Sequence, residues 1–180
     1  MRVVAIVGMA GAGKSEVARV FAKHGFRRVR FGDITDEELK NRGLEPNEEN
    51  ERYIRQQLRK EHGMAVYAKL NLPGIDSLLK SSNVVLDGLY SWEEYILLKE
   101  YYGGQFTTVA VWASPATRHA RLTRRAERPL TLEKAANRDK SEIENINKGG
   151  PIAMADFTII NGASLEELEK ETGRVLSALK

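Results

Sequence analysis

Residues Gly8 to Ser15 have the types and the spacing that are needed to hold a row of phosphate groups. They read Gly-Met-Ala-Gly-Ala-Gly-Lys-Ser, the pattern G-x-x-x-x-G-K-[ST], between an apolar run and a predicted helix. Glycines let backbone N–H groups turn toward phosphate oxygens, and the helix start adds unpaired amides and a positive dipole end. Lys14 is expected to reach the β- and γ-phosphates, and the Ser15 hydroxyl to bind Mg²⁺. We therefore predict an ATP-binding loop rather than a glycine-rich turn that binds nothing. Its contacting residues are Gly8, Met9, Ala10, Gly11, Ala12, Gly13, Lys14, Ser15 and Glu16.

Two aspartates stand where predicted strands end. Asp87 follows the apolar run 83–86, so its carboxylate could hold Mg²⁺ through water or accept a hydrogen bond from Ser15. A polar residue that merely terminates a strand is the alternative, and the phosphate-binding pattern favours the magnesium role. Asp33 follows the predicted strand 28–31 and could accept a proton from a substrate hydroxyl. Equally, Asp33 could cap the short helix that follows.

A second group of candidates is rich in arginine. Transfer of a phosphoryl group concentrates negative charge, and arginine stays protonated and forms bidentate contacts with phosphate. Arg118, Arg121 and Arg125 share one face of a predicted helix, Arg128 lies in the following turn, and Arg138 lies on the next helix. A solvated basic face is the alternative. We expect a lid with Arg121, Arg125 and Arg138 as catalytic residues, and Arg118 as a nucleotide contact.

Another arginine row lies along the predicted helix 48–62. Arg52, Arg55 and Arg59 recur at spacings of three and four residues, so they share one helical face. Two interpretations stay open: they hold a phosphate of the acceptor, or they pair with acidic residues of the same helix. The acidic residues available for such pairing are Glu48, Glu51 and Glu61.

Composition excludes several classes of protein. Of the 180 residues, 42% are hydrophobic and 29% charged, and no apolar run approaches the roughly 18 residues of a membrane span. The chain has no cysteine, which excludes disulfides and thiolate metal sites, and its three histidines lack metal-ligand spacing. A net charge of +3 does not by itself argue for nucleic-acid binding. We expect a cytoplasmic protein, either a monomer or a homodimer.

Hydrophobic patterning predicts five strands that alternate with helices, and hence an α/β domain around a mostly parallel sheet. Capping boxes are predicted at 35–38, 91–94 and 164–167, and a helix is predicted to end at Pro73-Gly74. The whole chain 1–180 is expected to form one domain, with two insertions on the ligand face at 34–74 and 118–148. The predicted strands cover residues 2–7, 28–31, 83–86, 107–113 and 156–160.

The order of these parts resembles the adenylate-kinase-type nucleoside monophosphate kinases and the dephospho-coenzyme A kinases. The chain is most similar to a largely archaeal, kinase-related branch. That resemblance implies a three-layer α/β/α P-loop NTPase fold, with a five-stranded parallel sheet in the order 2-3-1-4-5. It also implies ATP and Mg²⁺, a substrate-binding insert near 34–74, an arginine lid near 118–148, and Asp33 facing an acceptor hydroxyl. The loop implied to touch the donor adenine is Asn161, Gly162 and Ala163.

The chain departs from this pattern directly after Asp87-Gly88. Adenylate kinases carry an arginine there that clamps the acceptor monophosphate, whereas this chain has Leu89-Tyr90-Ser91-Trp92. Tyrosine can donate one hydrogen bond but does not neutralise charge, so phosphorylation of AMP is not expected.

Two hypotheses follow. In the first, the chain transfers the γ-phosphate of ATP to a nucleotide or a nucleotide-containing small molecule. In the second, the chain is a nucleotide-regulated binding protein with weak ATPase activity, with RNA as a possible partner.

Overall fold

The computed structural model describes residues 1–179, which form five strands and nine α-helices, with three consecutive helices after the second strand and three after the fourth. The strands are β1 (Val3–Val7), β2 (Arg27–Arg30), β3 (Val84–Asp87), β4 (Phe106–Trp112) and β5 (Phe157–Ile160). The helices are α1 (Lys14–Lys23), α2 (Asp33–Asn41), α3 (Glu48–His62), α4 (Val66–Leu79), α5 (Trp92–Tyr102), α6 (Pro115–Thr123), α7 (Leu132–Ile146), α8 (Gly149–Ala153) and α9 (Leu165–Ala178), with a 3₁₀ turn η1 (Gly103–Gln105) after α5.

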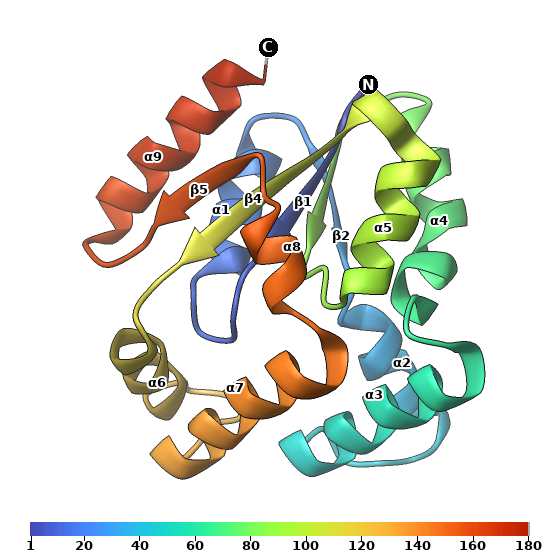
Figure 1. Ribbon diagram of the computed structural model, residues 1–180, viewed down its shortest axis with the longest axis vertical. Coiled ribbons are helices and arrows are strands. Elements are labelled where there is room, and N and C mark those ends of the chain that lie inside the picture. Colours follow the sequence, from blue (N-terminus) through green and yellow to red (C-terminus); the bar gives the residue numbers. More distant parts are fainter. Residues whose placement is uncertain (180) are drawn as a thin grey trace.

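All five strands form one parallel sheet in the order β2-β3-β1-β4-β5, which confirms the predicted order. In this register Ile6 of β1 lies opposite Asp87 of β3, and Val7 lies opposite Ala110 of β4. Because the strands are parallel, their carboxyl ends meet at one edge of the sheet. The loop after β1, Asp87 at the end of β3 and Asn161 after β5 are therefore brought to the same edge (Figure 1).

The central strands are buried on both faces, which explains their continuous apolar runs. Val4 and Ile6 of β1 belong to a core with residues of α1 and α9. Val3 and Ala5 point to the opposite face, into a core with residues of α3, α4 and α5. By contrast, β2 lies at an edge of the sheet, and its arginines are largely exposed. The result is a three-layer α/β/α arrangement.

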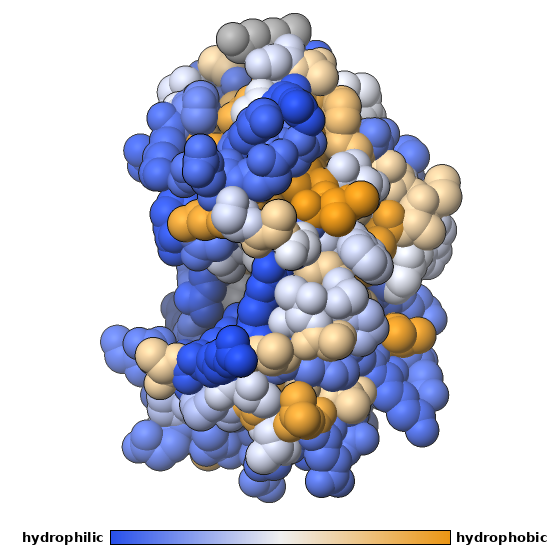
Figure 2. Space-filling view, turned by 90° about the vertical axis from the view of Figure 1, so that its left-hand side faces the viewer, coloured by the Kyte–Doolittle hydropathy of each residue, from blue (hydrophilic) through white to orange (hydrophobic). Residues whose placement is uncertain are grey.

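Helices α2, α3, α6 and α7 lie beyond the carboxyl edge of the sheet (Figure 1). They come from the two segments predicted as insertions, 34–74 and 118–148, and their roles as insert and lid stay predictions. The face drawn in Figure 2 is mostly hydrophilic, with hydrophobic residues in small, separate groups. None of the helices within residues 1–179 is long and apolar enough to cross a bilayer.

The prediction that a helix ends at Pro73-Gly74 is wrong, because α4 continues to Leu79. A proline inside a helix removes one backbone hydrogen bond and costs about 3 kcal/mol. Ile75, two residues later, is fully buried, and Leu78 and Leu79 pack against the same core. Full burial of one such side chain contributes about 1.5–3 kcal/mol, so Ile75, Leu78 and Leu79 together outweigh the lost bond.

Of the three predicted capping boxes, one forms in full and one in part. Ser91 and Glu94 form the full capping box of α5, and the Ser164 side chain accepts a hydrogen bond from the backbone N–H of Glu167. The box expected at 35–38 is wrong, since α2 begins at Asp33. Thr35 lies inside that helix, buried, with its hydroxyl 2.7 Å from the hydroxyl of Tyr67. Thr35 thus forms a buried hydrogen bond with Tyr67 in place of a bond that would cap the helix.

We predict that Ser91→Ala lowers the free energy of unfolding by roughly 2 kcal/mol, measured by urea denaturation. The buried Ser91 hydroxyl caps α5 and also donates to the carbonyl oxygen of Met64 at 3.0 Å. Ser164→Ala is the matched control: it removes an exposed cap alone and should lower stability by about 1 kcal/mol or less. Equal effects of the two substitutions would contradict a role for the bond to Met64.

Candidate active site

The loop between β1 and α1 approaches its neighbours so closely that three positions require glycine. Gly8, Gly11 and Gly13 have φ angles of +144°, +79° and +102°, which side-chain-bearing residues rarely adopt. A Cβ at Gly8 would lie 2.4 Å from the carbonyl oxygen of Val111, and one at Gly11 would lie 2.7 Å from that of Arg118. The loop is therefore wedged against β4 and α6, and within it the N–H of Ala12 donates to the carbonyl oxygen of Met9 at 3.2 Å.

Asn161 fixes the loop from the side of β5. Its Nδ2 donates to the carbonyl oxygen of Ala12 at 2.8 Å. Arg121 in turn donates from Nη2 to the backbone oxygen and the Oδ1 of Asn161, at 3.1 and 3.3 Å. The structure thus brings Arg121 and Asn161 together behind the loop, while Gly162 and Ala163 are exposed beyond β5.

Arg118 is buried and joins the loop to two helices. Its guanidinium makes two 2.7 Å hydrogen bonds with the carboxylate of Asp139 on α7. Further bonds reach the carbonyl oxygens of Ala10 and Ala113, at 3.1 and 3.2 Å. Burial alone would raise the pKa of Asp139, but hydrogen bonds from Arg118 and His119 lower it. The contacts of Arg118 are thus with the loop backbone and α7.

Lys14 projects into a cleft of about 180 Å³ in front of the loop. Its Nζ donates to the carbonyl oxygen of Met9 at 3.0 Å. Burial, followed by the positive charge of Lys148, lowers the pKa of Lys14 to about 7, although Glu142 and Asp87 oppose this shift. A negative group bound in the cleft would favour the charged ammonium.

Ser15 and Asp87 face each other at the other side of the cleft. The Ser15 hydroxyl donates to Oδ1 of Asp87 at 3.4 Å, and Arg28 of β2 forms an ion pair with Oδ2. Within residues 1–179 no cluster of three or more histidine, aspartate or glutamate side chains could hold a metal ion. Two hard oxygens from Ser15 and Asp87 fit Mg²⁺ that takes its other ligands from phosphates and water. Sequence reasoning missed Arg28, whose partner lies 59 positions away.

Two further cations meet in the cleft around Glu142 of α7. Arg138 donates from Nε to Glu142 at 3.1 Å and from Nη1 to Glu48 of α3 at 2.7 Å. Lys148, which sequence reasoning also missed, is buried, donates to Glu142 at 2.7 Å, and lies 5.4 Å from the centre of the Tyr90 ring. Although burial alone would raise the pKa of Glu142, Lys148, Arg138 and Lys14 hold it well below its usual range.

Arg125 and Arg128 reach the same cleft from the connection between α6 and α7. Arg128 has a φ of +53°, and its guanidinium pairs with Glu51 of α3 and, at 3.6 Å, with Asp36 of α2. Burial and the neighbouring Arg138 lower the pKa of Arg125, and no ion pair is formed by Arg125 in the described chain. Arg125 is therefore a cation of the cleft that remains available to a ligand.

The structure does not bring Asp33 into this cleft. Its carboxylate is 66% exposed and pairs with Arg30 at 2.9 Å, at the start of α2. One turn later, Asp36 lines the cleft. Because α2 begins at Asp33, Asp36 lies about one turn further along the helix. The aspartate that reaches the cleft is therefore one turn away from the predicted one.

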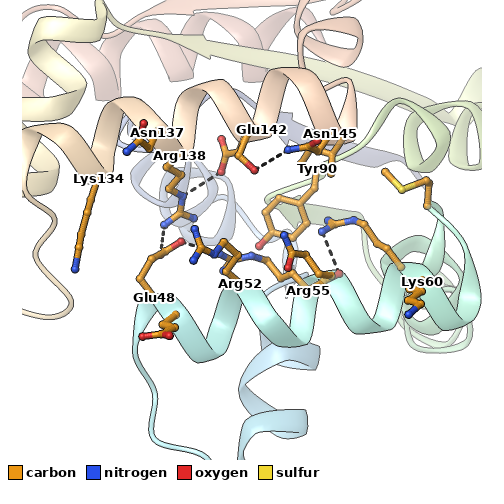
Figure 3. A pocket seen from close by; sticks show the side chains of 16 residues that line it. Glu48, Arg52, Arg55, Lys60, Tyr90, Lys134, Asn137, Arg138, Glu142 and Asn145 are labelled. Carbon is orange, nitrogen blue, oxygen red and sulfur yellow. Dashed lines mark hydrogen bonds and ion pairs between the residues drawn. The ribbon is translucent and has the colours of Figure 1, made fainter.

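A second cavity, of about 600 Å³, lies between α3 and α7. Figure 3 shows side chains of the two helices pointing toward each other, with Tyr90 between them. Arg55 pairs with Glu48 at 2.8 Å and with Glu51 at 3.1 Å. Of the two interpretations of the arginine row, pairing with acidic residues of the same helix therefore describes Arg55. The cavity shares part of its wall with the cleft at Lys14. The residues lining both are Glu48, Arg55, Tyr90, Arg138 and Glu142.

Comparison with known proteins identifies the family of the chain. A family model described as an AAA domain matches residues 4–147. A UPF0200 protein of the archaeon Hyperthermus butylicus is 37% identical, over 98% of this chain and 94% of its own. The match confirms the expected resemblance to a largely archaeal, kinase-related branch.

Solved kinase structures share the fold. A gluconokinase from Sinorhizobium meliloti superposes with a TM-score of 0.62 at 13% identity, covering 99% of this chain and 93% of its own. A shikimate kinase from Bacteroides thetaiotaomicron gives a TM-score of 0.62 at 14% identity, covering 99% of this chain and 98% of its own. The chain thus belongs to the UPF0200 family and carries an AAA domain with the fold of P-loop kinases.

Proposed function

We propose that the protein transfers the γ-phosphate of ATP to a small molecule held between α3 and α7. The observation that carries this proposal is the shared wall of the two cavities, one at the phosphate loop and one between the helices. A phosphoryl donor in the first would meet an acceptor in the second at Tyr90 and Arg138. A plain nucleotide-binding protein has no need of a second, connected cavity of this size. Kinases of this fold carry the same kind of chemistry.

In this mechanism the loop amides and Lys14 hold the β- and γ-phosphates, and Asn161 keeps the loop in place from behind. Mg²⁺ bound beside Ser15 and Asp87 would neutralise charge on the phosphates. Arg125 and Arg138, which line the cleft, would contact the migrating group, and Arg121 and Arg118 would support the loop from α6. Asp33 lies outside the cleft, and Glu48 and Glu142, which line both cavities, are the carboxylates that could orient an acceptor hydroxyl.

The acceptor proposed is a nucleotide or a molecule that contains one, because about 600 Å³ is room for a ligand of that size. Tyr90 stands where a monophosphate clamp would need a cation, and its hydroxyl stays protonated because burial raises its pKa. AMP is therefore not the expected acceptor. The first compounds to screen are dephospho-coenzyme A and the nucleoside monophosphates apart from AMP. Transfer is followed with γ-labelled ATP.

We predict that Lys14→Met lowers phosphoryl transfer by about 10²–10³-fold, measured with γ-labelled ATP and the acceptor found by the screen, since one donor to developing charge is worth that much. Lys23→Met is the matched control: Lys23 is exposed at the end of α1, and transfer should not change. Wild-type transfer by Lys14→Met would overturn the mechanism. If ATP binds and no acceptor raises its turnover above basal hydrolysis, the nucleotide-regulated binding protein is the correct alternative.

Binding of ATP should also take up a proton at alkaline pH. In the free protein Lys14, with its pKa at about 7, is mostly neutral at pH 8.5 and mostly charged at pH 6. Bound phosphates favour the ammonium, so we predict an uptake of about one proton at pH 8.5 and close to none at pH 6. Calorimetric titration in buffers of different ionisation enthalpy measures this number. The uptake should disappear in Lys14→Met, and equal uptake at both pH values would refute the prediction.

A further inference from the structure

Helix α5 carries apolar side chains on two faces, and only one of these faces is fully buried in the described chain. Tyr95, Leu98 and Tyr102 are buried in the core on one side of the sheet. Ile96 and Leu97 follow Tyr95 directly, and because consecutive residues of an α-helix point about 100° apart, both point away from that core direction. They are only partly buried. A helix that is apolar all round is normally buried on all sides, so the outer face of α5 is expected to have a covering partner.

The outer face of α5 and the neighbouring face of α4 enclose a groove of about 700 Å³. Hydrogen bonds hold the two helices together, since Tyr101 and Tyr102 both donate to the carboxylate of Asp76 on α4, at 2.8 and 2.9 Å. The hydroxyl of Ser91, just before α5, donates to the carbonyl oxygen of Met64, just before α4. The helices therefore start side by side and run in the same direction. The apolar side chains of the groove are Ala65, Leu72, Trp92, Ile96, Leu97 and Tyr101.

The groove lies on the outside of the molecule, away from the site of transfer. Figure 1 shows α4 and α5 next to each other at the outer edge on their side of the sheet. The opposite side of the molecule, drawn in Figure 2, is mostly hydrophilic. Tyr101 is 56% exposed at this groove. No residue of the groove lines the cleft at the phosphate loop or the cavity between α3 and α7. The groove is therefore a separate surface, and its apolar lining is typical of a protein contact site.

The charged residues at this groove differ in sign between the two helices. Glu93 and Glu100 of α5 line the groove, about two helical turns apart. Lys69 of α4 is exposed, and its spacing of four and three residues from Ala65 and Leu72 places it on the same helical face. In the part of the chain that the structure describes, none of these three charged side chains forms an ion pair. The surface is thus acidic along α5 and basic on α4.

We propose that the groove binds the same groove of a second copy of the chain, related to the first by a two-fold axis. Because α4 and α5 run in the same direction, an axis perpendicular to the pair lays α5 of each copy against α4 of the other. Lys69 of one copy then approaches Glu93 and Glu100 of the other, while the glutamates of the two copies stay about one helix spacing, roughly 10 Å, apart. A surface with an apolar strip and both charge signs is complementary to itself, which favours a second copy over an unrelated partner.

Sedimentation velocity of the full chain, from about 1 to about 100 μM, measures this association, and the wild type should form a dimer in that range. Lys69→Glu reverses one exposed charge at both symmetric contacts, so the dissociation constant of the dimer should rise about tenfold or more. Combining Lys69→Glu with Glu100→Lys exchanges the two signs and should recover part of the lost affinity. Lys40→Glu is the matched control: it reverses an exposed lysine of α2 outside the groove and should leave association unchanged.

A cross-link in the wild-type protein tests the same contact without a substitution. Unlabelled and ¹⁵N-labelled chains are mixed and treated with a carbodiimide, which joins a lysine to a carboxylate. A peptide of mixed labelling that joins Lys69 to Glu93 or Glu100 supports the proposal. A wild type that stays monomeric over the whole range, or a dimer that Lys69→Glu leaves unchanged, shows that the groove does not bind a second copy. Either result leaves the proposed phosphoryl transfer untouched, because the groove shares no residue with the two cavities.

Discussion

The whole site depends on close packing of the loop at 8–15 against β4 and α6, which keeps the loop from moving away from the cleft. The carbonyl oxygens of Val111 and Arg118 lie so close to Gly8 and Gly11 that even a methyl group would not fit. Asn161 closes the third side through its bond to Ala12. Parallel pairing makes this possible, since it delivers the ends of β1, β4 and β5 to one edge of the sheet. A rigid backing lets the amides of the loop point at a ligand without reorganising when charge develops there.

In front of the loop, cations and carboxylates alternate from α3 across to the residue before α8. The contacts run from Arg55 to Glu48, then to Arg138, Glu142 and Lys148, with nitrogen–oxygen distances between 2.7 and 3.1 Å. Each buried charge is thereby compensated in the absence of a ligand, which an isolated arginine in that position would not be. Phosphate groups entering the cleft offer the same charge as these carboxylates. Phosphates can therefore replace the carboxylates as ion-pair partners of the arginines without a large change in local charge.

The positions of the loop at 8–15 and of Asp87 were predictable because their sequence patterns are local. A contiguous motif marks the loop, and a strand end marks Asp87, so only the sheet order had to come from family resemblance. Lys148 was not predictable: lysines are mostly exposed, and its burial depends on how α7 turns into α8. Arg55 and Arg59 both line the cavity between α3 and α7, but only Arg55 pairs with glutamates, Glu48 and Glu51 of its own helix. This difference was readable from the spacing, because Arg55 has a glutamate four residues before it and Arg59 has an arginine there.

The bond from the Ser91 hydroxyl to the carbonyl oxygen of Met64 gives α3 two unlike ends. At Met64 the chain is fastened to the start of α5, directly after the strand that carries Asp87, by a buried neutral hydrogen bond that salt does not screen. Near its start the helix packs on α2 and forms ion pairs across the cleft, from Glu48 to Arg138 and from Glu51 to Arg128. Ion pairs weaken as ionic strength rises, so salt weakens the attachment at the start of α3 and not the hydrogen bond at Met64.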